Sequence, residues 1–175
     1  MLFRIALVLG LVLATADNLH AASATATVNT IDANGVGATL GAVTFTDTKD
    51  GLLITPSLSG LPAGVHGFHI HEKGACGPAE HEGKAAAGFA AGGHYDPSHS
   101  GRHFGPYSTA GHKGDLPVLV VDQDGKATLP VLAPHLRVED VSGRSIMIHA
   151  GGDNYSDRPA ALGGGGARIA CGVIK

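Results

Sequence analysis

Short runs in which apolar and polar residues alternate, separated by glycine-rich turns, extend along most of the chain. This period of two predicts β-strands. The predicted strands cover approximately residues 24–30, 37–46, 52–59, 65–72, 118–122, 127–132, 145–149 and 168–174. Asp50-Gly51 and Asp124-Gly125 are typical of hairpin turns, and both lie between consecutive predicted strands. No segment keeps a helical period, so the pattern predicts an antiparallel β-sandwich or flattened barrel.

Two connections interrupt this regular spacing. Residues 73–117 and 150–167 contain no strand pattern. A connection as long as the first one, without secondary structure of its own, argues against the strand assignment on either side unless the connection is functional. Here it carries four candidate metal ligands and one cysteine, and both kinds of group can order a loop that lacks a hydrophobic core of its own.

Six histidines and one aspartate recur in glycine-flanked motifs along the chain. They are His69, His71, His94, His103, His112, Asp115 and His149. Seven nitrogen and oxygen donors are too many for one tetrahedral zinc ion, which takes four ligands. They suffice for zinc and a neighbouring second metal that accepts several imidazoles in a flatter arrangement, for which Cu(II) is the leading candidate. The sequence therefore predicts a two-metal site.

Strand alternation separates the donors into two groups. His69 and His71 should lie on one face of their strand, with Phe68 and Ile70 on the other face, in the core. With His149 from another strand, three imidazoles outside the core form a plausible open copper site. The remaining donors suit a closed tetrahedral zinc site: His94, His103, His112 and Asp115.

Composition and charge narrow the class of protein. Glycine contributes 27 of the 175 residues and tryptophan is absent, so the core must be built from Val, Ile, Leu and Ala. The formal net charge is −3. A net-negative chain argues against nucleic acid or an anionic membrane as partner, and an anionic substrate would need local positive charge to reach the site.

The N-terminal segment predicts export. Arg4 precedes an apolar run over residues 5–14 that is too short to span a bilayer, and small residues follow at 19–21 and 22–24. We expect a signal peptide over residues 1–23, with the cleavage site approximate, and a mature domain over 24–175. An uncleaved amphipathic anchor is the alternative. In an exported protein the two cysteines, Cys76 and Cys171, predict a disulfide, with two free buried thiols as the alternative.

These motifs together resemble copper/zinc superoxide dismutases of the exported bacterial kind, over residues 24–175. The motifs are Gly-Phe-His-Ile-His-Glu (67–72), Ala-Gly-Gly-His-Tyr-Asp-Pro (91–97), Gly-His-Lys-Gly-Asp-Leu-Pro (111–117), Ile-His-Ala-Gly-Gly-Asp-Asn-Tyr-Ser-Asp (148–157) and Gly-Gly-Gly-Gly-Ala-Arg-Ile-Ala-Cys-Gly-Val-Ile (163–174). The resemblance implies an all-β, eight-stranded antiparallel Greek-key barrel or sandwich of immunoglobulin-like architecture with two long functional loops, and the family itself is a known member of that architecture.

The resemblance also implies a role for each site residue. The implied copper ligands are His69, His71, His94 and His149. The implied zinc ligands are His94, His103, His112 and Asp115, so His94 would be shared between the metals. Asp153 would link a copper histidine to a zinc histidine, and Arg168 would attract and orient the substrate beside copper. The alternatives are a loop-exposed aspartate and a surface arginine at a strand end.

The implied activity is the disproportionation of superoxide to dioxygen and hydrogen peroxide, by one-electron cycling of a copper ion bridged to zinc through a histidine. A non-catalytic copper/zinc-binding or copper-delivery module on the same scaffold is one alternative. A structural zinc protein with an incidental His-x-His pair is the other. We expect a periplasmic protein, with secretion as the alternative. It should have no nucleic-acid partner and no membrane partner after signal removal, and the sequence leaves monomer and homodimer open.

Three further basic residues are candidates to assist Arg168, and five further histidines are not expected to bind metal. The loop after His149 contains no lysine, so substrate steering beyond Arg168 would need a basic residue from the first long connection: Lys84, Arg102 or Lys113. The five other histidines are given no metal role: His20, His66, His81, His99 and His135. Of these, we expect His81 and His99 at the loop surface and His66 to be structural.

Overall fold

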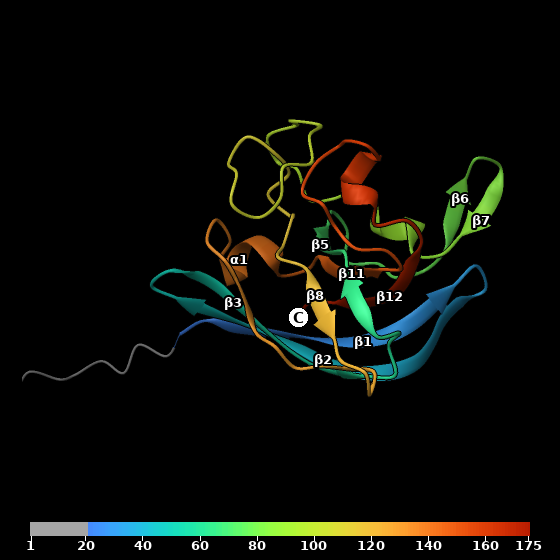
Figure 1. The fold of residues 1–175 in the computed structure, drawn as a ribbon, viewed down its shortest axis with the longest axis horizontal. Helices are drawn as coiled ribbons and strands as arrows, with labels where there is room; N and C mark the ends of the chain where they lie inside the picture. Colours follow the sequence, from blue (N-terminus) through green and yellow to red (C-terminus); the bar gives the residue numbers. More distant parts are fainter. Residues whose placement is uncertain (1–20) are drawn as a thin grey trace, which may run out of the picture.

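The computed structural model describes residues 21–175, and nearly all of the predicted signal peptide lies outside this range. Seven strands form a continuous sheet in the order β10-β3-β2-β1-β12-β11-β5. Their bounds are β1 (Ser23–Asp32), β2 (Gly35–Thr48), β3 (Gly51–Ser59), β5 (Phe68–His71), β10 (Val131–Ala133), β11 (Ser145–His149) and β12 (Arg168–Val173). In Figure 1 the long strands β1, β2 and β3 form a curved lower layer, with β5, β11 and β12 above it.

Of three further short strands, one joins this sheet and the other two form a separate two-stranded sheet. β9 (Lys126–Ala127) pairs with β3, while β4 (Gly64–His66) pairs with β8 (Leu119–Val121). Every strand pair is antiparallel. The predicted all-β antiparallel fold is confirmed. The β2–β3 hairpin also turns at the predicted Asp50-Gly51 signal, since Thr48 pairs with Gly51.

The core fills the space enclosed by the curved sheet. Its largest fully buried aliphatic and phenyl side chains include Phe45, Phe68, Leu52, Ile54, Ile70, Ile146 and Ile148. Each comes from a strand on which alternate residues point inward. Phe68 and Ile70 therefore occupy the positions that the alternation predicts, and the histidines between them point out of the core.

The predicted strand over 65–72 is interrupted at Gly67. The backbone of Gly67 bonds to the second long loop, with its N–H 2.7 Å from the Gly151 carbonyl and its own carbonyl 2.9 Å from the His149 N–H. A Cβ at this position would lie 3.1 Å from His69 Cε1, so a side chain would press on that ring. The interruption lets the loop dock against β5. The predicted strand over 127–132 is likewise two strands, β9 and β10.

The first long connection is not free of strands, which corrects the prediction for residues 73–117. It contains the hairpin β6 (Ala79–His81) and β7 (Lys84–Ala86), followed by the 3-10 turn η1 (Phe89–Ala91). Three residues per strand are too few for alternation to be read from the sequence. Figure 1 shows this hairpin projecting away from the sheet.

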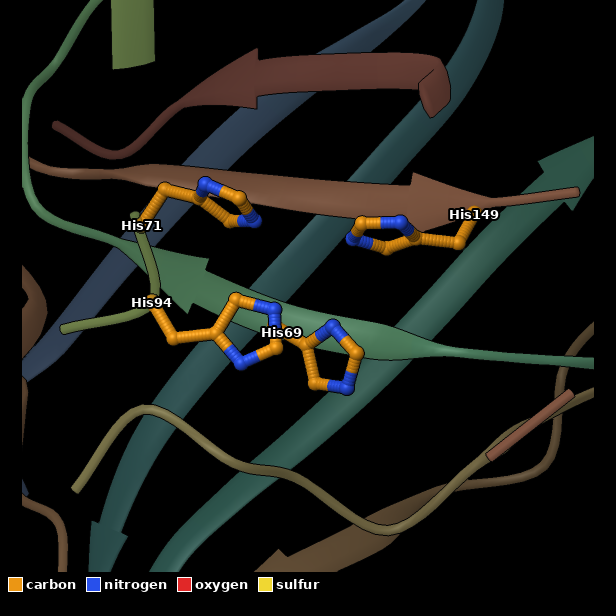
Figure 2. A group of neighbouring side chains, drawn as sticks. All are labelled: His69, His71, His94 and His149. Carbon is orange, nitrogen blue, oxygen red and sulfur yellow. The ribbon is translucent and has the colours of Figure 1, made fainter. Parts of the chain in front are cut away.

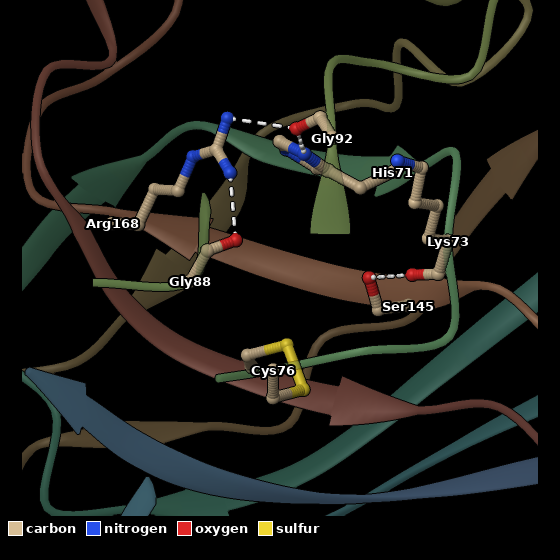
Figure 3. Close-up of a disulfide and its surroundings, with 8 residues drawn as sticks. His71, Lys73, Cys76, Gly88, Gly92, Ser145 and Arg168 are labelled. Carbon is tan, nitrogen blue, oxygen red and sulfur yellow. Dashed lines mark hydrogen bonds between the residues drawn. A yellow bond between two sulfur atoms is a disulfide. The ribbon is translucent and has the colours of Figure 1, made fainter. Parts of the chain in front are cut away.

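Three other features complete the fold. The helix α1 (Val138–Val141) has four residues, too few to show a helical period, and the second connection contains the 3-10 turn η2 (Ala161–Gly164). The predicted disulfide is confirmed: Cys76 and Cys171 join the first long connection to β12 (Figure 3). Within residues 21–175, no helix is long and apolar enough to cross a membrane.

Candidate metal centre

Four histidines converge above β5 and β11. His69 and His71 come from β5, His149 ends β11, and His94 comes from the first long loop (Figure 2). One ring nitrogen of each lies within 4.8 Å of one such nitrogen on every other. All four side chains are buried, although they lie outside the apolar core. The sequence therefore predicted the face on which they lie, but not that the rings would be buried.

Each of these four histidines has a buried ring nitrogen without a hydrogen-bond partner. The atoms are His69 Nδ1, His71 Nε2, His94 Nε2 and His149 Nε2. A buried polar atom without a partner costs free energy, so four of them turned toward one another require a ligand. Several imidazole nitrogens suit copper. This geometry fits the predicted copper site.

A second group surrounds Asp115. Its Oδ1 atom lies 3.0 Å from His94 Nδ1, 3.0 Å from His103 Nδ1 and 3.4 Å from His112 Nδ1. The four-residue group whose ligand atoms all lie within 4.8 Å of one another on this side contains His69 in place of His112. His112 suits the fourth position better than His69, because His69 Nε2 already contacts Asp153 and its Nδ1 belongs with the unpartnered nitrogens of the first group. Three imidazoles and a carboxylate suit tetrahedral zinc.

His94 adjoins both groups. Its Nδ1 is 3.0 Å from Asp115, while its Nε2 is buried without a partner beside the other copper-side histidines. A ligand that bridges two metals needs one ring nitrogen for each of them. The geometry of His94 meets this requirement, as the resemblance implied.

Hydrogen-bond acceptors behind the rings determine which nitrogen is free to bind metal. His71 Nδ1 lies 3.0 Å from the Gly92 carbonyl, and His149 Nδ1 lies 3.3 Å from the Gly166 carbonyl. Because a carbonyl only accepts hydrogen bonds, these Nδ1 atoms carry the protons. The Nε2 atoms of both rings are therefore left with lone pairs that face the site, the arrangement typical of metal-ligating histidines.

Asp153 joins the two groups. Its Oδ2 accepts from His69 Nε2 at 2.7 Å, and its Oδ1 accepts from His103 Nε2 at 2.8 Å. The side chain is fully buried, so the alternative of a loop-exposed aspartate is wrong. Gly163 of η2, with a φ of 72°, permits this arrangement, because a Cβ there would overlap the Asp153 carboxylate. Each carboxylate oxygen thus orients one ring: Oδ2 orients His69 in the first group and Oδ1 orients His103 in the second.

The pKa values follow from burial and these contacts. Burial, reinforced by the charge of His94, lowers the pKa of His69 and His71 well below the usual value, and that of His149 to about 4. The copper-side rings are therefore neutral, as metal ligands must be. At His103 burial acts in the same direction, but the nearby carboxylates of Asp115 and Asp153 outweigh it and raise the pKa to about 9. A metal binding at His103 must displace a proton.

Arg168 begins β12 beside His149, with which it is paired in the sheet. Its Nη1 donates to the Gly88 carbonyl at 2.7 Å and its Nη2 to the Gly92 carbonyl at 2.9 Å (Figure 3). The Gly92 carbonyl also accepts from His71, so arginine and copper-side histidine share an acceptor. Arg168 is half-buried and fixed at both Nη atoms, which excludes a freely exposed surface arginine.

The other basic residues lie in different settings. Lys113 pairs with Asp140 at 2.6 Å, so its charge is already compensated. Lys84 is exposed on the β6–β7 hairpin, and Arg102 lies over the Phe104 ring at 5.9 Å. Of the three steering candidates, Lys113 is therefore the least suited to attract an anion.

The histidines without a predicted metal role lie outside both groups in the described part of the chain. His66 is buried between two carbonyls, with Nδ1 2.8 Å from His149 O and Nε2 2.9 Å from Pro62 O, so it is structural as predicted. His81, His99 and His135 are exposed, while His20 lies outside the described residues.

The sequence also matches a model of a known protein family. The family model described as "Copper/zinc superoxide dismutase (SODC)" matches residues 39–174. This chain belongs to the copper/zinc superoxide dismutase family. The resemblance drawn from the motifs is confirmed, and with it the Greek-key β-barrel of that family.

Relatives from bacteria cover nearly the whole chain. The "Superoxide dismutase [Cu-Zn]" of Escherichia coli (strain K12) is 53% identical over 166 residues, which are 94% of this chain and 95% of the relative. The solved structure of the Brucella abortus enzyme is 46% identical with a TM-score of 0.85, and the monomeric enzyme of Salmonella enterica is 54% identical with a TM-score of 0.78. Both alignments cover 88% of this chain and 100% of the other.

Sequence reasoning missed three contributions to the site. The carbonyls of Gly88 and Gly92 hold Arg168, and the ring of Phe89 lies against the same guanidinium. A backbone carbonyl has no side-chain signature. The sequence signal is the pair of glycines at either end of η1, Gly88 and Gly92, since both adopt positive φ, at 67° and 77°.

Proposed function

We propose that this chain disproportionates superoxide to dioxygen and hydrogen peroxide at the paired metal site. The proposed copper ligands are His69, His71, His94 and His149, and the proposed zinc ligands are His94, His103, His112 and Asp115. The observation that carries the proposal is the set of six buried ring nitrogens without partners, arranged in two groups that adjoin at His94. When bound, copper supplies one-electron redox chemistry, whereas zinc has none and holds His94 and the loop in place.

The side chains of this protein perform the remaining tasks. Arg168 supplies local positive charge to a protein whose net charge is −3, and its planar guanidinium orients a small anion. His94 Nε2 is the buried nitrogen at which a proton can be held for peroxide formation. Asp153 keeps His69 and His103 in the tautomers that the ligand positions require.

A non-catalytic copper-delivery module is the second candidate. Such a protein would be expected to lack a copper ligand or the arginine, and this chain retains every one of them in a single buried constellation. The enzyme is therefore the better interpretation.

The test measures metal content and superoxide consumption on the same purified sample. We expect one copper and one zinc per chain, and activity that disappears on chelation and returns when both metals are restored. Cobalt placed in the zinc position should couple magnetically to copper, and replacing His94 should abolish this coupling. An active, fully loaded sample without copper contradicts the proposal, and a copper- and zinc-loaded sample without activity favours the delivery module.

We further propose that residues 1–23 direct export to the periplasm and are then removed. The apolar run after Arg4 and the following small residues support this proposal. Mass spectrometry of protein from a fractionated envelope should find a chain that begins near residue 24. Recovery of full-length protein bound to membranes would favour the uncleaved anchor, and recovery from the medium would favour secretion. Sedimentation of the same sample would distinguish a homodimer from a monomer.

A further inference from the structure

The Arg168 guanidinium has a third neighbour besides its two carbonyl acceptors. Its Cζ atom lies over the Phe89 ring, 4.1 Å from the ring centroid. Phe89 is the first residue of η1, and the residues on either side of this turn, Gly88 and Gly92, supply the two carbonyls. One short segment therefore provides both hydrogen-bond acceptors and the aromatic ring that contact the guanidinium.

This segment is rigidly placed. Gly88 has a φ of 67°, and a Cβ there would lie 2.7 Å from Ile31 Cδ1 and 3.0 Å from Met147 Cε. The Gly92 N–H closes the turn on the Phe89 carbonyl at 3.1 Å, and the Ala90 N–H bonds to Gly77 next to the disulfide at 3.2 Å. The backbone that carries the phenyl ring thus has little freedom to move away from Arg168.

The hairpin β6–β7 also contacts the ring. His81, the last residue of β6, stacks on Phe89 with ring centroids 4.2 Å apart and an interplanar angle of 27°. His81 is exposed and Phe89 half-buried. The projecting hairpin is therefore coupled to Arg168 through one aromatic ring.

We propose that Phe89 is a positioning residue that holds the Arg168 guanidinium in the orientation that receives an anion at the copper site. The proposal rests on the proposed role of Arg168. The two carbonyls fix the Nη atoms but do not by themselves prevent the plane from tilting, whereas a ring face 4.1 Å from Cζ resists that tilt. Two of the five N–H donors are used in recorded hydrogen bonds, which leaves three for an anion.

The first experiment compares variants in azide binding to the copper- and zinc-loaded protein, followed by visible absorption. Phe89→Leu keeps apolar volume but removes the ring, and we expect azide affinity and the superoxide rate constant to fall about threefold to tenfold, within the range of a partly desolvated cation–π contact. Phe89→Tyr keeps an aromatic ring, so its azide affinity and superoxide rate constant should stay within about twofold of the parent values. Tyr107→Leu, at an aromatic residue that is 69% exposed, serves as the matched control.

The second experiment is a double-mutant cycle. If Phe89 acts through Arg168, Phe89→Leu should have no further effect on azide affinity in an Arg168→Ala background. In copper-free, zinc-loaded protein, ¹⁵N relaxation at Arg168 Nε should show a more mobile side chain in Phe89→Leu than in Phe89→Tyr. A general structural defect would instead lower metal content and thermal stability. Phe89→Met is the second variant if Phe89→Leu does not fold.

The outcomes separate the two proposals. One outcome is that azide affinity is lost in Arg168→Ala but stays at the parent level in Phe89→Leu and Phe89→Met. That result would overturn the positioning role of Phe89 and leave the proposed function intact. Additive effects in the cycle would also overturn it. If Arg168→Ala itself changes neither azide affinity nor the superoxide rate, the proposed role of Arg168 fails first, and the role of Phe89 fails with it.

Discussion

The barrel and the two long loops are held together by different interactions. In the barrel, side chains such as Phe45, Ile54 and Ile146 are almost fully buried against one another. In the loops, Asp115 and Asp153 hold the histidines through polar contacts with their ring nitrogens. Hydrophobic burial needs no ligand, whereas a cluster of unpartnered imidazole nitrogens does. The barrel should therefore fold without metal, and the loop layer should depend on it.

Truncation of the core should have the largest effect on stability. Phe45→Ala leaves a cavity in the middle of the barrel, where the parent side chain has no exposed surface. We expect a loss of about 3–5 kcal/mol in the free energy of unfolding, similar in metal-free and loaded protein. Denaturant unfolding of both forms measures it. A large loss in the loaded protein alone would contradict the separation between barrel and loops.

Removal of the disulfide tests the connection between the two regions. Cys76 belongs to the first loop and Cys171 to β12, 95 residues further along the chain. We expect the double variant Cys76→Ser, Cys171→Ser to lose roughly 2–5 kcal/mol of stability. Hydrogen exchange should increase mainly over residues 73–93 and remain slow in β2 and β3. Uniformly faster exchange throughout the barrel would show that the bridge stabilises the whole fold instead.

The contact of Asp153 with both metal groups should affect binding more than folding. Asp153→Asn keeps the size of the side chain but can no longer accept from both His69 and His103 as a carboxylate does. We expect zinc and copper affinity to fall about tenfold to a hundredfold, as is typical when such a supporting partner is lost. Competition with a chelator measures it. Asp157→Asn is a useful comparison, because Asp157 accepts hydrogen bonds from the backbone N–H groups of His103 and Leu162 rather than from an imidazole ring.

Arg168 should affect the rate while leaving both regions intact. For Arg168→Ala we expect the superoxide rate constant to fall about tenfold or more, since local charge in a cleft raises association rates by that order. Copper and zinc content should not change. Arg168→Lys should retain part of the activity, because the charge survives without the planar donor set. The parent rate should also fall with ionic strength, since screening acts over about 8 Å at physiological salt. Parent-like turnover in fully loaded Arg168→Ala would refute the role.

The strands of the barrel could be predicted because the alternation of apolar and polar residues that identifies a strand is a local pattern. Each strand shows its own alternation, so Phe68 and Ile70 were correctly placed in the core and His69 and His71 on the other face. The hairpin β6–β7, the break at Gly67 and the helix α1 escaped prediction, because two to four residues cannot show a period. The burial of the histidines was missed for another reason: the loops that cover them have no pattern that would predict where they lie.

The sequence by itself determined the all-β architecture, the number and kind of metal donors, and membership of the family, because residue type and spacing carry that information. Only the tertiary structure decided how the donors are oriented. Asp153 reaches His69 across 84 residues of chain, and Arg168 reaches the carbonyl of Gly92 across 76. The contact of the Phe89 ring with the Arg168 guanidinium has the same origin. Carbonyl acceptors and rings that meet across distant segments have no local pattern, so their roles emerge only when the chain has folded and brought them together.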